Sequence, residues 1–324
     1  MLPIFDYVRV EEVKDAVRHL SVPGARAHAG GTDLLGCLQD GVLEAKTVVS
    51  LSRIRQLKGI REEGGRLRIG ATTSIAEIAR HPLIKERYRA LAESASEVAS
   101  PQLRNQGTIG GNLCQKPRCW YYRGDFHCLR KGGEICYATA GDNRFHCIFG
   151  GDPCYMVHPS DTAPALVALQ AELRIVGPKG MRTVAAEDFF ILPAKDVRNE
   201  TTLQPGEIVT DILLPRPAEG VRSSYRKVRA RGAWDFALAG VAIAAQMDAD
   251  TVKTCRLVLA GAAPSPWRSK EAEAKLTGKP LTGETIVAAA EAAVAAAQPL
   301  DANTYKVPLF KGLIEQELKR LAAG

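Results

Sequence analysis

The sequence predicts an α+β protein of two domains, and three observations carry this prediction. The chain has 324 residues, enough for about two domains at roughly 150 residues each. Short segments with strand and helix periodicities alternate as far as residue 214, where Pro215 and Pro217 interrupt the pattern. Beyond them, three longer strand patterns precede three helical ones, an order typical of α+β domains. We therefore expect one domain at 1–217 and a second at 221–324.

The individual elements follow from the spacing of apolar residues. Apolar residues recur at helical spacing over 13–20 and predict one buried helix face. A strand, a helix and a strand are expected after it at 25–29, 32–38 and 47–51. Pro101 is expected to end the helical pattern before it. The other elements expected in the first domain are strands at 57–60, 67–70, 172–176 and 208–214 and helices at 74–80, 83–99 and 161–169. Those expected in the second are strands at 221–229, 237–247 and 254–260 and helices at 267–276, 284–297 and 309–321.

The composition is that of an ordinary globular protein. Lys and Arg number 43 against 36 for Asp and Glu, a formal net charge of +7. Nucleic-acid binding would require aromatic interleaving or a known motif beside the basic run at 222–231, so we interpret this run as a solvated strand face or a contact with an anionic cofactor or partner. No apolar run reaches the roughly 18 residues of a membrane span, and the closest, at 286–297, contains Glu291.

Two glycine-rich turns are candidate anion sites. Gly30 and Gly31 lie between an expected strand and helix, with Thr32 or Asp33 as N-cap, so that backbone N–H groups can approach a phosphate. A second turn at 107–112 offers further amides and a hydroxyl. Either turn alone is equally typical of a tight turn with a capped helix. Together they fit the two ends of one pyrophosphate, although neither matches G-x-G-x-x-G and the sequence has no P-loop motif.

The eight cysteines are unevenly distributed, with six of them between residues 114 and 154. No pair has the C-x-x-C spacing of zinc ribbons or bacterial ferredoxins. Scattered thiols in a loop rich in glycine and aromatic residues suit an iron–sulfur cluster held by four of the six. A mixed Cys/His zinc site and thiols without a metal remain open as interpretations. The histidines available for a zinc site are His127, His146 and His158.

The cysteines also bear on the compartment. A disulfide framework is typical of short secreted chains, whereas Asp6 and Glu11 stand here where a signal peptide would carry its apolar run. We therefore expect reduced cysteines in a cytoplasmic protein, or in a periplasmic one whose partner subunit carries the export signal.

Five motifs together resemble a known family. They are AGGTDLL at 29–35, TIGGN at 108–112, HPSD at 158–161, PGEI at 205–208 and YRKVRARGAWDFALAG at 225–240. They are similar to those of the FAD-binding medium subunit of the molybdenum hydroxylases, the family of xanthine dehydrogenase, carbon monoxide dehydrogenase and 4-hydroxybenzoyl-CoA reductase. The resemblance covers essentially the whole chain. It implies an FAD-binding domain of the p-cresol methylhydroxylase type in two α+β subdomains, followed by a smaller α+β C-terminal domain.

The resemblance also implies which residues hold FAD. Both glycine loops would hold the pyrophosphate, the first of them largely through backbone amides. Asp161 corresponds to an acidic residue near the cofactor, Val209 to an apolar contact after the PGEI turn, and Lys227 to a basic residue near the flavin. The two loops contribute Ala29, Gly30, Gly31, Thr32, Asp33, Leu34, Thr108, Gly110, Gly111 and Asn112.

Most members of the family pass directly from TIGGN to the HPSD-like turn, whereas this sequence inserts residues 113–157. The insertion resembles that of 4-hydroxybenzoyl-CoA reductase and the molybdenum aldehyde oxidoreductases, whose flavin subunit carries an extra [4Fe–4S] cluster. Cys114 and Cys147 are then ordinary thiols, with Cys147 as the alternative to Cys154 at the fourth position. The ligands that the resemblance implies are Cys119, Cys128, Cys136 and Cys154.

The function implied by the resemblance is electron transfer. FAD would exchange electrons with clusters of partner subunits, and the extra cluster would link it to an external electron donor or acceptor. A large subunit would carry the molybdenum cofactor and a small subunit two [2Fe–2S] clusters. No acid–base or nucleophile constellation lies beside the glycine loops, so we assign no catalytic residue. The alternatives are a self-sufficient flavin oxidase and a zinc-loop interaction module.

Overall fold

Three sheets organise the chain, of which the computed structural model describes residues 1–323. The first sheet is parallel, with strand order β1 (Asp6–Arg9), β3 (Thr47–Ser50), β2 (Ala25–His28). Two helices accompany it, α1 (Val13–Leu20) and α2 (Leu34–Gln39). Successive side chains of β3 point to opposite faces, so Val49 packs in a core with α1 and Val48 in a second one with α2. This unit is the N-terminal subdomain.

The second sheet is antiparallel, and its central strand, β8 (Ile208–Pro215), is the most buried strand of the chain. The strand order is β4 (Ile60–Glu63), β5 (Arg66–Gly70), β8, β6 (Glu172–Gly177), β7 (Gly180–Ala185). Buried side chains of this sheet and most of its helices form the largest hydrophobic core. Those helices are α3 (Ile75–Arg80), α4 (Pro82–Arg87), α5 (Arg89–Glu97), α6 (Pro101–Gln106), α7 (Ile109–Leu113), α9 (Thr162–Ala168) and α10 (Ala186–Phe189).

The third sheet forms the C-terminal domain and is buried on both faces. Its strand order is β12 (Trp267–Arg268), β11 (Thr251–Ala260), β10 (Ala239–Asp248), β9 (Val221–Val228). On β10, Val241 and Ile243 pack in the core of this domain, whereas Ala242 between them packs in the core of the second sheet. The two domains are therefore joined by apolar packing. The helices of this domain are α11 (Lys270–Leu276), α12 (Gly283–Val294) and α13 (Lys306–Ala323).

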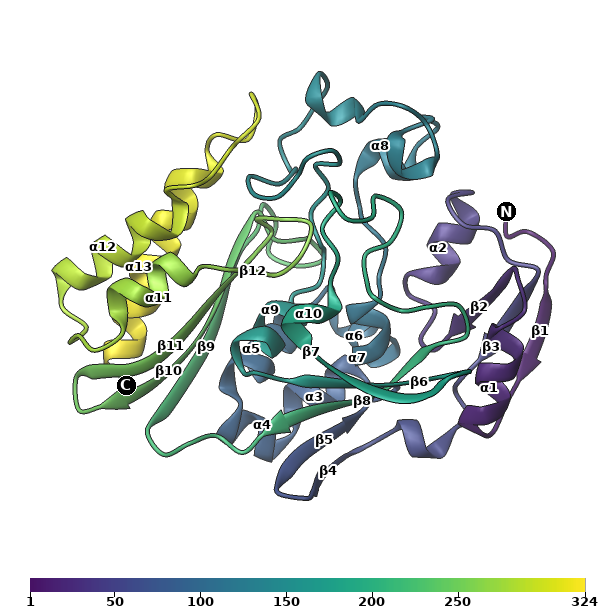
Figure 1. The fold of residues 1–324 in the computed structure, drawn as a ribbon, viewed down its shortest axis with the longest axis horizontal. Coiled ribbons are helices and arrows are strands. Elements are labelled where there is room, and N and C mark those ends of the chain that lie inside the picture. The colour runs from purple at the N-terminus through teal and green to yellow at the C-terminus, as the bar shows by residue number, and fades with distance from the viewer. Residues whose placement is uncertain (324) are drawn as a thin grey trace.

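The cysteine-rich insertion is almost free of regular structure. Between α7 and α9 the chain forms only the short helix α8 (Trp120–Arg123) and the 3-10 turns η2 (Leu129–Lys131) and η3 (Tyr137–Thr139). Figure 1 shows this teal segment at the top of the view, between the N-terminal subdomain on the right and the C-terminal domain on the left. Among residues 1–323, no helix is both long and apolar enough to cross a lipid bilayer.

The predicted α+β class is confirmed, while some element boundaries were wrong. The helix expected at 83–99 is broken at Tyr88, whose hydroxyl donates a hydrogen bond of 3.0 Å to the Pro215 carbonyl. Ala90 N–H then donates to the hydroxyl of Ser223. Pro101 begins α6 instead of only ending a helix. These partners lie more than a hundred residues away, so local periodicity carries no trace of them.

Four further differences concern short elements at the edges of sheets. Residues 55–57 form the 3-10 turn η1 (Arg55–Leu57), so the strand expected at 57–60 begins only at Ile60. Trp267 pairs with Leu259 in the third sheet, and the helix expected from it begins at Lys270. Strands β1 and β7 were not predicted, because exposed strands of four to six residues show little apolar alternation.

Candidate functional site

The two glycine loops pack directly against each other. The first follows β2 and leads into α2, and the second lies between α6 and α7. A Cβ atom on Gly30 would stand 2.0 Å from the carbonyl oxygen of Gln106, and the Gly107 Cα is also within reach. Only glycine allows this approach of two backbones. Two segments far apart in the sequence thus meet at one place.

The second loop is held by its own cap and by the HPSD turn. The Thr108 hydroxyl accepts a hydrogen bond of 3.3 Å from Gly111 N–H, which caps α7. The amide oxygen of Asn112 accepts hydrogen bonds from the hydroxyls of Ser160 (2.6 Å) and Thr162 (2.7 Å). Asn112 therefore joins two of the family-like motifs through its side chain.

A groove begins at the glycine loops and continues between the domains. Its first part has a volume of about 250 Å³, and its second, mainly apolar part has a volume of about 560 Å³. Arg118, Pro159, Asp161, Asp235 and Phe236 line both parts. Both volumes together are in the range of cofactor pockets. The predicted residues in its walls are Thr32, Asp33, Thr108, Gly111, Asn112 and Asp161.

Asp161 is part of a buried ion pair at the centre of the groove. Its carboxylate lies 2.8 Å from Lys227 Nζ and accepts a second hydrogen bond of 2.8 Å from the Tyr225 hydroxyl. The Lys227 side chain is fully buried and also donates to the carbonyl of Glu97. Burial raises the pKa of Asp161, and the Lys227 and Tyr225 partners oppose this rise. The two residues expected near the flavin thus meet, with Lys227 reaching the groove through Asp161.

Other predicted cofactor residues do not line the groove. Gly30, Gly31 and Gly110 pack behind its walls: a Cβ on Gly110 would lie 3.0 Å from Ala71. Val209 is buried within β8, opposite Ile175, in the largest core. The remaining two predicted residues are Ala29, directly before Gly30, and Leu34, the first residue of α2.

Arg118 is a groove residue that sequence reasoning missed. It lines both parts of the groove, pairs with Asp33 at 2.9 Å, and places its guanidinium 5.1 Å from the ring centre of Phe236. A guanidinium is well suited to bind phosphate. The available signal was its place next to Cys119, in a run considered only for its cysteine.

Asp33 ties the first glycine loop to the cysteine insertion. Its carboxylate accepts hydrogen bonds from the backbone N–H of Lys116 (2.7 Å) and from Arg123 Nη2 (2.8 Å), in addition to its pair with Arg118. These partners all belong to the insertion. The Asp33 side chain, expected at the cofactor, therefore serves to fix the insertion against the loop.

Four cysteines line one small space, hereafter the cysteine cavity. They are Cys119, Cys128, Cys136 and Cys154, the four implied as ligands. Cys114 and Cys147 do not line it. The cavity has a volume of about 10 Å³, room for roughly one water molecule. Cys119 lines both the cysteine cavity and the apolar part of the groove, so it lies in the wall between them.

The thiols of the cysteine cavity differ in their surroundings. The neighbouring thiol of Cys154 lowers the pKa of Cys136. Burial raises the pKa of Cys119 to about 11, although backbone N–H groups of the α8 turn oppose this rise. Arg130 also lines the cavity and is paired in the interior with Glu200. The space is thus mainly apolar, with one buried cation at its edge.

The C-terminal domain holds the insertion from the other side. The Asn303 amide donates to the carbonyls of His146 (3.0 Å) and Cys147 (3.1 Å), and Ala302 N–H donates to the Asn143 side chain (2.9 Å). Lys306, which is fully buried, donates a hydrogen bond of 2.8 Å to the Gly261 carbonyl. The cysteine cavity is therefore fixed by both domains.

Lys306 is expected to make stability depend on pH. Burial lowers the pKa of Lys306 from 10.5 to about 8. Between these values the unfolded chain binds the proton and the folded chain does not, so the free energy of unfolding rises with pH, by a contribution on the order of 3 kcal/mol. Lys306→Met should lack this rise. Urea unfolding of both proteins from pH 7.5 to 10.5 measures the difference, and parallel curves would contradict the assignment.

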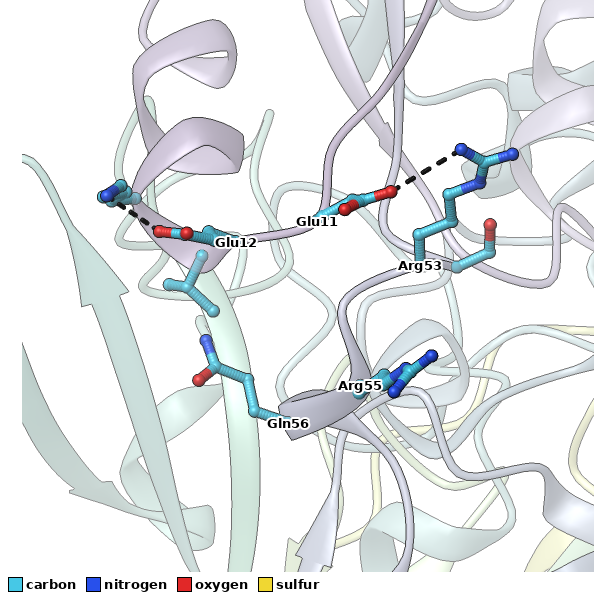
Figure 2. A pocket seen from close by; sticks show the side chains of 8 residues that line it. Glu11, Glu12, Arg53, Arg55 and Gln56 are labelled. Atoms are coloured by element: carbon cyan, nitrogen blue, oxygen red, sulfur yellow. Dashed lines mark ion pairs between the residues drawn. The ribbon is translucent and has the colours of Figure 1, made fainter.

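A separate depression near the N-terminus carries none of the predicted residues. It is open, polar and about 840 Å³ in volume, between the start of α1 and the turn η1. Figure 2 shows the ion pair of Glu11 with Arg53, 3.6 Å apart, and Glu12 pairs with Lys14 at 2.8 Å. The groove and the cysteine cavity are therefore the features that bring the predicted residues together.

Comparisons with known proteins agree with this arrangement. Residues 3–217 match the family described as the FAD-binding domain in molybdopterin dehydrogenase, and residues 223–319 match the C-terminal domain of carbon monoxide dehydrogenase flavoproteins. The chain is 35% identical to the aldehyde oxidoreductase FAD-binding subunit PaoB of Escherichia coli, over 98% of each chain. It is 31% identical to the carbon monoxide dehydrogenase medium chain of Hydrogenophaga pseudoflava, over 92% of this chain and 89% of that one.

A solved structure supports the same relationship. A chain of the carbon monoxide dehydrogenase from Hydrogenophaga pseudoflava superposes with a TM-score of 0.80 at 30% sequence identity, over 100% of this chain and 99% of that one. These relatives are subunits of oxidoreductases. The chain therefore belongs to the FAD-binding medium subunits of the molybdenum hydroxylase family.

Proposed function

We propose that this FAD-binding subunit also carries a [4Fe–4S] cluster and transfers electrons between the flavin, its partner subunits and an external electron donor or acceptor. The observation that carries the proposal is the cysteine cavity. Four of the six clustered cysteines line it, and one of the four, Cys119, also lines the groove. The two cofactors would thus share a wall.

The groove fits FAD in charge and shape. Amides of the first loop around Gly30 would hold the pyrophosphate beside the second loop, whose Gly111 N–H already caps α7, and Arg118 adds a positive charge in the same wall. The mainly apolar part of the groove suits the ring system. FAD supplies one- and two-electron chemistry when bound. The protein's own part is to hold it beside the insertion, whose position Asp33 fixes.

The cysteine cavity favours a cluster over a zinc ion. Within residues 1–323, no three His, Cys, Asp or Glu side chains are arranged to bind one metal ion. A structural zinc ion needs four ligands that converge on one point, whereas in a [4Fe–4S] cluster each cysteine binds a different iron. The cavity is small, so its side chains would move apart as the cluster binds. Four thiolates and mainly apolar neighbours are the donor set that such clusters use.

Substrate chemistry belongs, in this proposal, to a partner subunit. Asp161, the central acid of the groove, is already paired with Lys227 and Tyr225 and is therefore not free to take a proton from a substrate. The relatives include carbon monoxide dehydrogenase medium chains. We propose by this similarity a large subunit with the molybdenum cofactor and a small subunit with [2Fe–2S] clusters as partners.

Metal and flavin analysis of the purified full-length chain tests the proposal. We expect one FAD and about four irons per chain, with no zinc. FAD without iron would leave the FAD-binding subunit in place and contradict the cluster. Zinc in place of iron would support an interaction module. Rapid oxidation of an alcohol or aldehyde by the chain alone, with peroxide as product, would support a self-sufficient oxidase and contradict the need for a partner.

A further inference from the structure

His146 is placed where the groove and the cysteine cavity meet. Its Nε2 lies 3.2 Å from the Cys119 sulfur, within hydrogen-bond range for a sulfur acceptor. The residue is buried and lines the apolar part of the groove. Cys119 is the cysteine that lies in the shared wall. The imidazole is thus in contact with the one cysteine that faces both features.

The position of His146 is fixed from several sides. Its N–H donates to the Asn143 carbonyl (2.9 Å), and its carbonyl accepts from the Asn303 amide. The ring of Tyr121 lies beside the imidazole, with ring centres 6.0 Å apart. Among residues 1–323 Nδ1 has no hydrogen-bond partner, so Nε2 is the nitrogen with a defined contact. Backbone anchors from both the insertion and the C-terminal domain therefore aim the imidazole at Cys119.

The chemistry of a bound thiolate determines the direction of this hydrogen bond. A sulfur that ligates iron has no proton and acts only as acceptor, so the contact requires the proton on Nε2. Hydrogen bonds to cluster sulfurs tune the reduction potential. The reduced cluster carries one more negative charge, so an N–H donor stabilises the reduced form more than the oxidised form.

We propose that His146 is a positioning residue that donates a hydrogen bond from Nε2 to the sulfur of Cys119 and raises the reduction potential of the cluster. This inference rests on the proposed function, because it requires the cluster. Three histidines lie in or beside the insertion, and the inference assigns this role to His146 alone. His127 is exposed, and His158 packs against Phe190 with ring centres 4.7 Å apart.

Redox titration of the full-length chain, followed by the electron paramagnetic resonance of the reduced cluster, tests this role. His146→Leu removes the donor. At the wild-type midpoint potential we expect its ratio of oxidised to reduced cluster to rise by about five- to tenfold, because the hydrogen bond is present in both oxidation states and only the difference in its strength between them shifts the potential. His146→Gln, whose amide reaches the same position, should stay within about twofold of the wild type. His127→Leu is the matched control, because His127 adjoins Cys128 but is exposed.

The outcomes separate the inference from the proposed function. Wild-type protein without iron would contradict the proposed function, and the inference with it. Iron retained in His146→Leu with an unchanged potential would overturn the inference alone. If His146→Leu lost its iron, His146→Asn, whose amide is too short to reach the sulfur, would take its place, and an unchanged potential there would overturn the inference too. A shift in His127→Leu equal to that in His146→Leu would also overturn it.

Discussion

Serine at any one of the four cysteines of the cysteine cavity is expected to abolish binding of the cluster. Iron should fall from about four per chain to near zero, because a neutral hydroxyl does not replace a soft, charged thiolate. FAD should remain bound, since the glycine loops and Arg118 are unchanged. Iron and flavin analysis of each purified variant measures both quantities. The variants are Cys119→Ser, Cys128→Ser, Cys136→Ser and Cys154→Ser.

Cys114→Ser and Cys147→Ser are the matched controls and should keep their iron. Both cysteines belong to the same segment, but neither lines the cysteine cavity. Cys147 is buried beside Gly151, where a Cβ atom would stand 2.5 Å from its sulfur, and its N–H donates to the Tyr155 carbonyl. This position favours Cys154 as fourth ligand. Iron lost from Cys147→Ser and kept in Cys154→Ser would reverse the assignment.

The sequence predicted those parts of the fold that local patterns encode. The alternation of apolar residues gave the strands of the C-terminal sheet, and the glycines gave both loops of the groove. Tyr88 shows the limit, since its helix break depends on Pro215 and Ser223, which lie far away in the chain. Strands β1 and β7 show another, because exposed edges need no apolar residues.

The insertion shows a different limit. Its sequence has little periodicity, so the spacing of the six cysteines did not show which of them are ligands. Only the resemblance selected four. Arg118, His146 and Asn303 acquire their roles through contacts with other segments: with Asp33 in the first loop, with Cys119, and with the His146 carbonyl. Such partners depend on the tertiary structure. Local sequence therefore indicates which kind of site is present. It is a poorer guide to the residues that position or tune that site.

The second prediction concerns Gly30, where alanine should weaken FAD binding strongly and leave the cluster in place. The new Cβ would stand 2.0 Å from the Gln106 carbonyl oxygen, and this neighbour is backbone, which cannot rotate away. The two loops must separate, so the pyrophosphate loses the amides of one of them. The loss of about two hydrogen bonds to a charged group costs about 3 kcal/mol, or roughly a 100-fold weaker affinity for FAD.

Gly36→Ala is the control for this substitution, because no described residue outside the backbone of α2 has an atom within 4 Å of its Cβ position. Alanine there should leave FAD affinity unchanged and stabilise the helix by about 0.5–1 kcal/mol. Quenching of flavin fluorescence measures the affinity, and iron analysis reports the cluster. Wild-type affinity in Gly30→Ala would show that the loops do not share the pyrophosphate. If Gly30→Ala loses flavin and keeps iron, and the cysteine variants lose iron and keep flavin, the two cofactors bind independently of each other.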